Sequence, residues 1–220
     1  MSILKNLSKI RSEASHKVKI VAVVASHSVR EINQALFLDV KDVAEIIVSE
    51  AKKKKAKIKY PVNWHFVGTL KKSDVKDAVE TFNLIQTVDS LDIAKTIDKQ
   101  CWRSKKNMSI LIRVNILGYK NVQGVKKDQL IMFLKQLSGL KNLSVLGLMC
   151  SISSINMDEA NIDKHFKDMN KLFRSVKKEK IQGIKMKYLS MGTSQDYPLA
   201  LKNSSNMLLL DKAIFDKKKR

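Results

Sequence analysis

The side chains that could do chemistry in this chain are scattered and form no recognised catalytic motif. Glu45 and Asp89 could act as a general acid and base if the fold brought them face to face. The simpler interpretation makes Glu45 a hydrogen-bond acceptor at the end of a strand and Asp89 the N-cap of a helix. The hydroxyl-rich segment 151–154 lacks the G-x-S-x-G motif that activates a serine. These residues alone do not predict an enzyme.

The cysteines and histidines predict neither a metal site nor a reactive thiol. Cys101 and Cys150 are far apart, and no three histidines or carboxylates have a ligand spacing. This cysteine usage fits a reduced intracellular protein, so we expect a cytoplasmic location and thiols that act as small hydrophobic groups. His65 lies beside Trp64 in an apolar run. We therefore expect a hydrogen-bonded core histidine rather than a ligand or a base.

Eight short apolar runs predict the strands that must position these side chains. The runs are nearly continuous rather than alternating, as is typical of parallel strands covered by helices. They occupy residues 18–24, 43–47, 64–67, 84–88, 109–116, 144–150, 187–190 and 207–210.

Amphipathic stretches between these runs predict helices. Ser90 is a suitable N-cap for one of them. The clearest stretch, 157–180, has an apolar stripe, an acidic start and a basic end, which suit the helix dipole. We expect a short amphipathic helix at the N-terminus and further helices over residues 29–37, 74–82, 90–100, 127–137 and 157–180.

The alternation of strands and helices predicts a single-domain α/β protein, a (β/α)8 TIM barrel. We expect the barrel to span residues 1–216 and a basic tail to follow at 217–220. A doubly wound open sheet is the alternative, but it would more often have a glycine-rich loop after the first strand. Here that strand runs into Ala25, Ser26 and His27, and no G-x-G-x-x-G motif or phosphate-binding loop occurs.

The formal net charge of +21 leaves a second function open, an interaction module that binds RNA or an acidic protein. Only six of the 42 basic residues are arginines, the residue preferred for bidentate phosphate contacts. The basic runs contain no interleaved aromatic residues, which is more typical of solvated helix ends than of a nucleic-acid surface. We therefore treat nucleic-acid binding as the weaker alternative.

Membrane insertion and secretion are not expected. No apolar run approaches the roughly 20 residues that a membrane span requires. The first residues of the chain lack the apolar core and cleavage site of a signal peptide. We expect a monomer without membrane contact.

A series of motifs resembles the pyridoxal-phosphate homeostasis proteins, which share their barrel with the N-terminal domain of bacterial alanine racemase. Residues 64–70 read W-H-F-V-G-T-L and are similar to that family's W-H-F-I-G-x-L. Residues 189–196 read L-S-M-G-T-S-Q-D and resemble its L-S-M-G-M-S-x-D. Further similar motifs are V-D-S-L at 88–91, V-N-I at 114–116 with Gly118 and Gly124, G-L-M at 147–149 and A-I-F at 213–215.

The resemblance implies a protein that binds pyridoxal 5′-phosphate and buffers or delivers it, without catalysis. It implies a lysine that forms an imine at the end of the first strand, an arginine beside the pyridine nitrogen, and donors around the phosphate. The phosphate donors carried over to this chain, together with a lysine near them, are Ser190, Gly192, Thr193, Ser194 and Lys212.

This chain departs from the family at the cofactor positions. Ala25 stands where the imine-forming lysine belongs, Ile46 replaces an amide, and Leu209 replaces the arginine. Asp211 replaces a glycine near the phosphate, where a carboxylate would repel a phosphate dianion unless Lys212 offsets it. We therefore expect a degenerate cofactor site that captures a phosphorylated vitamer without a covalent bond and contains no catalytic residue.

Overall fold

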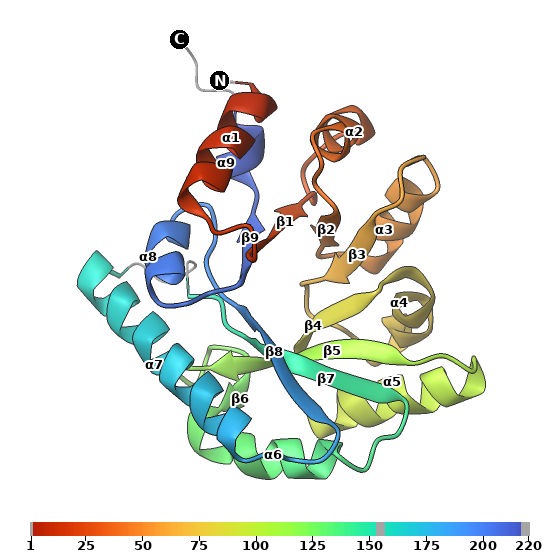
Figure 1. The fold of residues 1–220 in the computed structure, drawn as a ribbon. Coiled ribbons are helices and arrows are strands. Elements are labelled where there is room, and N and C mark those ends of the chain that lie inside the picture. Colours follow the sequence, from red (N-terminus) through yellow and green to blue (C-terminus); the bar gives the residue numbers. More distant parts are fainter. Residues whose placement is uncertain (1, 153–156, 217–220) are drawn as a thin grey trace.

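The chain folds into a closed barrel of parallel strands surrounded by helices, as Figure 1 shows. The structure, a computed structural model, describes residues 2–152 and 157–216. The expected basic tail at 217–220 and positions 153 and 154 of the hydroxyl-rich segment lie outside the described residues.

Eight strands form the ring, which closes where the last strand pairs with the first. Ala22 lies opposite Leu210 at that seam, and a pairing of the fourth and fifth strands completes the circle. The fold therefore confirms the predicted (β/α)8 barrel. The ring strands are β1 (Lys19–Val23), β2 (Asp42–Glu45), β3 (Asn63–Phe66), β4 (Leu84–Val88), β5 (Met108–Asn115), β7 (Leu143–Met149), β8 (Ile184–Ser190) and β9 (Met207–Leu210).

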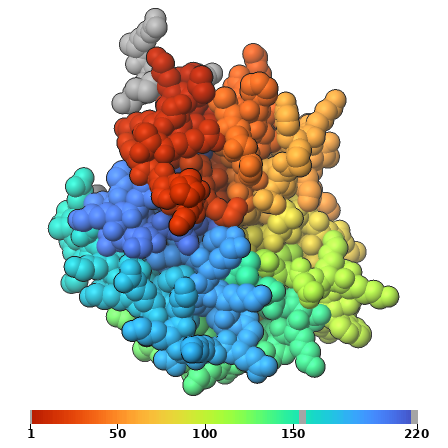
Figure 2. Space-filling model, viewed as in Figure 1, coloured from red at the N-terminus to blue at the C-terminus, as the bar shows by residue number. Residues whose placement is uncertain are grey.

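Helices cover the outside of the ring. The first helix packs against the last, where Asn6 Nδ2 donates to the carbonyl of Ile214 at 2.9 Å. In Figure 2 the red N-terminal part of the surface lies directly against blue C-terminal segments. A two-residue strand, β6 (Val125–Lys126), pairs with the end of β5. The helices are α1 (Ile3–Glu13), α2 (Val29–Phe37), α3 (Val48–Lys55), α4 (Val75–Thr81), α5 (Leu91–Arg103), α6 (Leu130–Leu137), α7 (Glu159–Lys178), α8 (Tyr197–Lys202) and α9 (Lys212–Phe215), with 3-10 turns η1 (Lys72–Asp74) and η2 (Lys127–Gln129).

Side-chain caps fix where several helices begin. Ser28 and Glu31 form a capping box at α2, and Asp158 accepts from the N–H of Asn161 at α7. Ser90 Oγ accepts from the N–H of Ile93, so Ser90 caps α5. The expectation that Asp89 would be an N-cap is therefore wrong, because the preceding strand ends one residue before Asp89 and the helix begins after Ser90.

The strands separate two apolar regions. Ala22 and Val24 belong to the larger core between the ring and the helices. Inside the ring a smaller cluster comprises Val21, Ala44, Leu84, Leu111, Met149 and Met207. Because side chains alternate along a strand, residues in step with this inner cluster point towards the barrel axis.

A chain of buried polar groups crosses the barrel interior. Lys19 Nζ lies 2.8 Å from Asp42 Oδ2, and His65 Nε2 lies 3.2 Å from Asp42 Oδ1. The amide of Gln86 contacts His65 Nδ1 at 2.8 Å, and Ser190 Oγ donates to Gln86 Oε1 at 2.7 Å. Since Nδ1 accepts from the amide, Nε2 carries the proton that His65 donates to Asp42. His65 is therefore a satisfied core histidine, as expected.

No helix in the described part of the chain combines the length and the apolar character needed to cross a membrane.

Candidate functional site

A cavity of about 360 Å³ lies at the mouth of the barrel, where the carboxyl ends of the strands meet. Larger hollows, including one of about 710 Å³ between α1 and α2, lie away from the carboxyl ends of the strands. Active and binding sites of this fold occur at the carboxyl ends of the strands, so the mouth is the candidate site. It is lined by Val23, Val67, Thr87, Arg113, Met149, Ser151, Thr193, Ser194, Gln195, Leu209, Asp211 and Lys212.

Ala25 lies two residues after the end of β1, and its methyl side chain contains no amine. A lysine from α3 comes close to it, because Lys54 Nζ donates to the carbonyls of Val24 at 2.6 Å and Ala25 at 3.0 Å. The same ammonium contacts Glu45 Oε2 at 2.5 Å. A lysine ammonium has three N–H donors, and these three contacts use all of them. Lys54 is therefore a structural cation and does not replace the missing amine.

The two carboxylates considered as an acid–base pair have separate partners. Glu45 is buried, bound by Lys54 and by the N–H of Ile46, so it acts as a hydrogen-bond acceptor as expected. For Asp89, burial raises the pKa of the carboxyl, and the charge of Arg113 opposes that rise. Among the described residues no contact joins Glu45 to Asp89.

The loop after β8 supplies two hydroxyls to the mouth. Thr193 donates both its N–H and its Oγ1–H to Asp196 Oδ1, at 2.5 and 3.0 Å. Ser194 Oγ accepts from the N–H groups of Asp211 and Ala213, each at 3.0 Å. Within the described ranges the Ser194 hydroxyl has no acceptor for its own hydrogen, so this hydrogen can donate to a ligand in the mouth.

Three of the five residues expected around the phosphate line the mouth, and two do not. Thr193, Ser194 and Lys212 line the cavity, and their binding role stays a prediction. Ser190 is fully buried below it and hydrogen-bonded to Gln86. Gly192 has φ +100°, and a Cβ there would lie 2.5 Å from the Cβ of Ala200, so this glycine permits the packing of α8.

The positions that replace other cofactor contacts differ in their access to the mouth. Leu209 lines the cavity and adds to its apolar wall. Ile46 is outside the lining and partly exposed on the surface. Of these two residues, Leu209 therefore reaches the cavity and Ile46 does not.

The carboxylate of Asp211 has a partner that the sequence did not reveal. Asp211 Oδ1 lies 2.6 Å from His27 Nε2, and the His27 ring stacks on Phe215 with centroids 3.9 Å apart. Glu31 Oε2 lies 3.9 Å from the other ring nitrogen. Because Asp211 is held by His27 and is followed by Lys212, the repulsion expected between this carboxylate and a phosphate is reduced.

Arg113 is the mouth residue that sequence reasoning missed. It lies on β5 two positions beyond Leu111, a member of the inner cluster, and so points into the barrel. Arg113 Nη1 donates to Gln123 Oε1 at 2.7 Å. Burial lowers the pKa of the guanidinium and Asp89 opposes the change. The available signal was an arginine at an inward position of the apolar run 109–116.

Metal binding and thiol chemistry find no support in the described residues. No group of three or more His, Cys, Asp or Glu side chains in residues 2–152 and 157–216 could hold a metal ion. Both cysteines are buried, and burial raises the pKa of the thiols of Cys101 and Cys150 to about 11 and about 12. Their reactive thiolate forms are therefore disfavoured at neutral pH.

The residues of the mouth suit the phosphate group of pyridoxal 5′-phosphate but not the covalent attachment of its aldehyde. A phosphate is matched by a lysine and a free hydroxyl donor, on Lys212 and Ser194, and Arg113 adds a second cation on another wall of the mouth. Covalent attachment from the end of β1 is not matched, because Ala25 has no amine and Lys54 is fully engaged. The residues thus suit a phosphorylated ligand held without a bond from β1.

Comparison with known proteins agrees with this fold. Residues 1–209 match the family described as alanine racemase, N-terminal domain. A pyridoxal phosphate homeostasis protein of Synechocystis is 30% identical over 210 residues, covering 94% of this chain and 95% of that protein.

Three solved structures share the fold of this chain. PipY of Synechococcus elongatus without PLP superposes with a TM-score of 0.92 at 25% identity, covering 98% of this chain and 100% of that one. PipY with PLP bound gives a TM-score of 0.90 at 24% identity, with the same coverage of both chains. An alanine racemase of Clostridium difficile, at 14% identity and a TM-score of 0.82, shares the fold over all of this chain and 56% of its own length.

Fold and mouth together define a single-barrel protein of the alanine racemase N-terminal class. Within that class, the chain belongs to the pyridoxal phosphate homeostasis protein family.

Proposed function

We propose that this protein binds a phosphorylated vitamin B6 vitamer reversibly in the barrel mouth and contributes to cofactor homeostasis by binding rather than by turnover. The observation that carries the proposal is a mouth with phosphate-binding groups but without an available lysine at the end of β1. The names of the relatives and the PLP-bound structure of PipY support the class of ligand. We expect the protein to act as a monomer in the cytoplasm.

The phosphate would lie near β8 and β9. Lys212 supplies a positive charge there, and the Ser194 hydroxyl supplies a donor whose own acceptor contacts are already filled by two N–H groups. The Lys212 ammonium and the Ser194 hydroxyl would both stabilise a bound phosphate dianion, because charge-assisted hydrogen bonds are stronger than neutral ones. The Asp211–His27 contact keeps the nearby carboxylate engaged.

The pyridine ring would lie against the apolar wall of the mouth. Val23, Val67, Met149 and Leu209 come from four different strands or strand ends and line the same cavity. A volume of about 360 Å³ lies within the range of small-molecule sites, which are mostly apolar with a few polar anchors.

The alternative of an RNA-binding or acidic-protein-binding module gains no support from the comparisons, since the relatives named there are homeostasis proteins and racemases. Catalysis gains none from the mouth, where the described residues provide no nucleophile paired with a base.

Calorimetric titration with pyridoxine 5′-phosphate, which has no aldehyde, tests reversible capture directly. We expect saturable binding that Lys212→Ala weakens about tenfold or more, because a charge-assisted contact is lost. Lys53→Ala, a change at an exposed lysine on α3, is the matched control and should leave the affinity unchanged. Absence of saturable binding would refute the proposal.

The lack of a covalent bond is tested with pyridoxal 5′-phosphate itself. After mixing, borohydride reduction and peptide mass spectrometry should find no stoichiometric adduct on any lysine. Lys212 is the lysine that lines the described mouth, so it is the position to inspect first. A stoichiometric reduced adduct there would replace reversible capture with a relocated covalent attachment.

A further inference from the structure

Two cations line the described part of the mouth, and the proposed phosphate site uses one of them. Lys212 follows β9, whereas Arg113 belongs to β5. In the ring, β7 and β8 separate β5 from β9 on one side, and β1 to β4 separate them on the other. The two cations therefore project from well-separated walls of the cavity. A single phosphate held at β8 and β9 leaves Arg113 without a ligand contact.

The protein partners of Arg113 do not satisfy its guanidinium. Arginine has five N–H donors, and among the described residues Arg113 donates to Gln123 Oε1 alone. Gln123 is exposed, and its Oε1 also accepts from Thr69 Oγ1 at 3.0 Å. Asp89 offsets part of the charge, but no hydrogen bond joins it to the guanidinium. In the free protein these open donors are left to water, so an anion that enters the mouth can bind them through charge-assisted hydrogen bonds.

Arg113 shares the lining of the mouth with apolar and hydroxyl side chains. Val67 and Met149 line the same cavity as Arg113, and Thr87 adds one hydroxyl. A planar carboxylate matches a guanidinium through two parallel hydrogen bonds, which a neutral group does not. The arrangement thus favours a ligand with a second anionic group, on a different arm from the one that carries its phosphate.

We propose that Arg113 makes the mouth selective for phosphorylated vitamers that also carry a carboxylate, as an amino-acid conjugate of the vitamer does. The inference rests on the proposed function and names the ligand class of the same site. Arg113 is then a specificity residue that contacts the ligand directly.

The competing explanation is structural. Arg113 could serve only to hold residues 118–124 through Gln123, which would make its loss a folding defect. Gln123→Ala removes that tether and keeps the guanidinium, so it separates the two roles. Arg113→Gln removes the charge, and Arg113→Lys keeps the charge but loses the bidentate geometry.

The test compares two stable secondary amines that differ at one group. N-(5′-phosphopyridoxyl)glycine carries a carboxylate, and N-(5′-phosphopyridoxyl)ethylamine has a methyl group in its place; neither has an aldehyde. We expect the wild-type protein to bind the glycine compound about tenfold more tightly or better, as a charge-assisted bidentate contact provides. Arg113→Gln should bring this ratio close to one with little change for the ethylamine compound, and Gln123→Ala should keep it.

Arg113→Lys should show an intermediate ratio, and thermal melting of each variant checks that the fold is intact. Equal wild-type affinity for the two amines would overturn the inference, as would a ratio that survives Arg113→Gln or disappears in Gln123→Ala. Binding of pyridoxine 5′-phosphate without binding of either amine would overturn it too, and would leave the proposed function standing. Failure of all three ligands to bind would overturn both.

Discussion

A buried carboxylate inside the barrel is held in its charged form by its neighbours. Asp42 contacts Lys19 and His65, and Asn63 Nδ2 donates to it at 3.1 Å. Burial acts to raise the pKa of Asp42, but the hydrogen bonds from His65 and Lys19 outweigh it and lower the pKa to about 2. A buried charge of this kind is tolerated because it is paired and hydrogen-bonded.

This depressed pKa links Asp42 to acid stability. An unfolded aspartate titrates near 3.8, so the folded state favours the carboxylate form by about 2 kcal/mol. That contribution is fully present above the unfolded pKa and is lost as the pH falls from about 4 towards 2. We expect Asp42→Asn to show a shallower fall in the free energy of unfolding over this window, measured by urea denaturation. Asp39→Asn, at an exposed surface pair, should keep the wild-type slope, and a wild-type slope in Asp42→Asn would contradict the account.

At the scale of elements, the strands were predictable because a covered parallel strand requires a continuous apolar run. The runs at 84–88 and 207–210 match β4 and β9 residue for residue, and the others differ at their ends. Helix α3 was missed because half of its eight residues are lysine and only Val48 and Ala51 are buried. Helices α8 and α9 have six and four residues, too few to show a helical period.

The candidate site was less predictable than the fold because it depends on contacts between distant segments. Thr193, Ser194 and Lys212 were found through their motifs. The His27–Asp211 contact joins residues 184 positions apart, which no local pattern reveals. Arg113 looked like an interruption of an apolar run, and only the direction of its side chain makes it a mouth residue.

The lysine run of α3 contains one residue that joins three elements. Lys54 connects α3 to Glu45 of β2 and to the carbonyls at the end of β1. The side chains of Lys54 and Glu45 are 12% and 1% exposed, whereas that of the neighbouring Lys53 is 68% exposed. Removal of one partner of a buried pair leaves an uncompensated charge.

Lys54→Met should therefore lower the free energy of unfolding by roughly 3–5 kcal/mol. The double variant Lys54→Met/Glu45→Met should recover most of this loss, because it removes both charges. Lys53→Met is the matched control and should change stability by less than about 0.5 kcal/mol, as an exposed pair does. Urea denaturation of the four proteins measures all of these values. A loss in Lys54→Met as small as that in Lys53→Met would show that the pair is not effectively buried.

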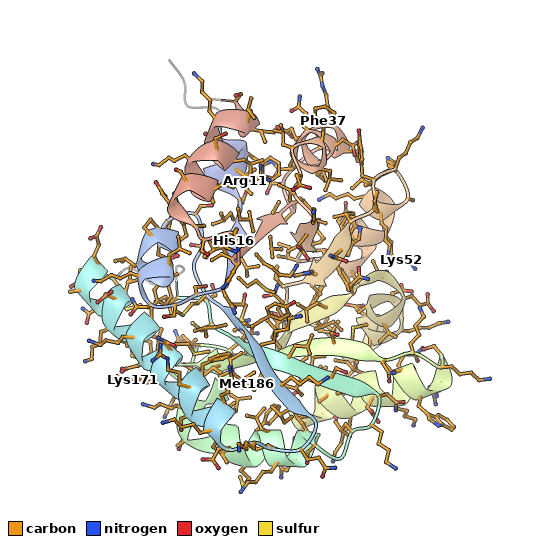
Figure 3. The ribbon with its side chains drawn as sticks, in the orientation of Figure 1. Arg11, His16, Phe37, Lys52, Lys171 and Met186 are labelled. Atoms are coloured by element: carbon orange, nitrogen blue, oxygen red, sulfur yellow. The ribbon has the colours of Figure 1, made fainter. Side chains whose placement is uncertain are left out.

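At the scale of the whole molecule, the excess of positive charge is a property of the outer surface. The 42 basic and 21 acidic residues leave a formal charge of +21. Lys52 and Lys171, labelled in Figure 3, project from α3 and α7 on the outside of the barrel. The groove between α4 and α5 is lined by Lys72, Lys76, Lys95, Lys99 and Arg103, with Asp92 as its one carboxylate among the lining residues.

Such an excess destabilises the folded protein, because the positive charges on its surface repel one another. Added salt should screen this repulsion. Surface ion pairs are weakened by salt as well, but each contributes only about 0–1 kcal/mol, whereas the net charge acts over the whole surface. We expect the melting temperature to rise by about 2–4 °C between 10 and 200 mM sodium chloride, as the screening length falls from about 30 to below 10 Å. Chloride is preferred to sulfate because sulfate also strengthens apolar burial.

A variant with a smaller excess of positive charge separates repulsion from other effects of salt. Lys95→Glu/Lys99→Glu lowers the charge in the α4–α5 groove without touching the mouth. Because fewer like charges then face one another, this variant should melt higher than wild type at 10 mM salt and gain less from added salt. Calorimetric melting of both proteins across the salt series measures the difference. A melting temperature that falls with salt in the wild type would mean that the surface ion pairs outweigh the repulsion.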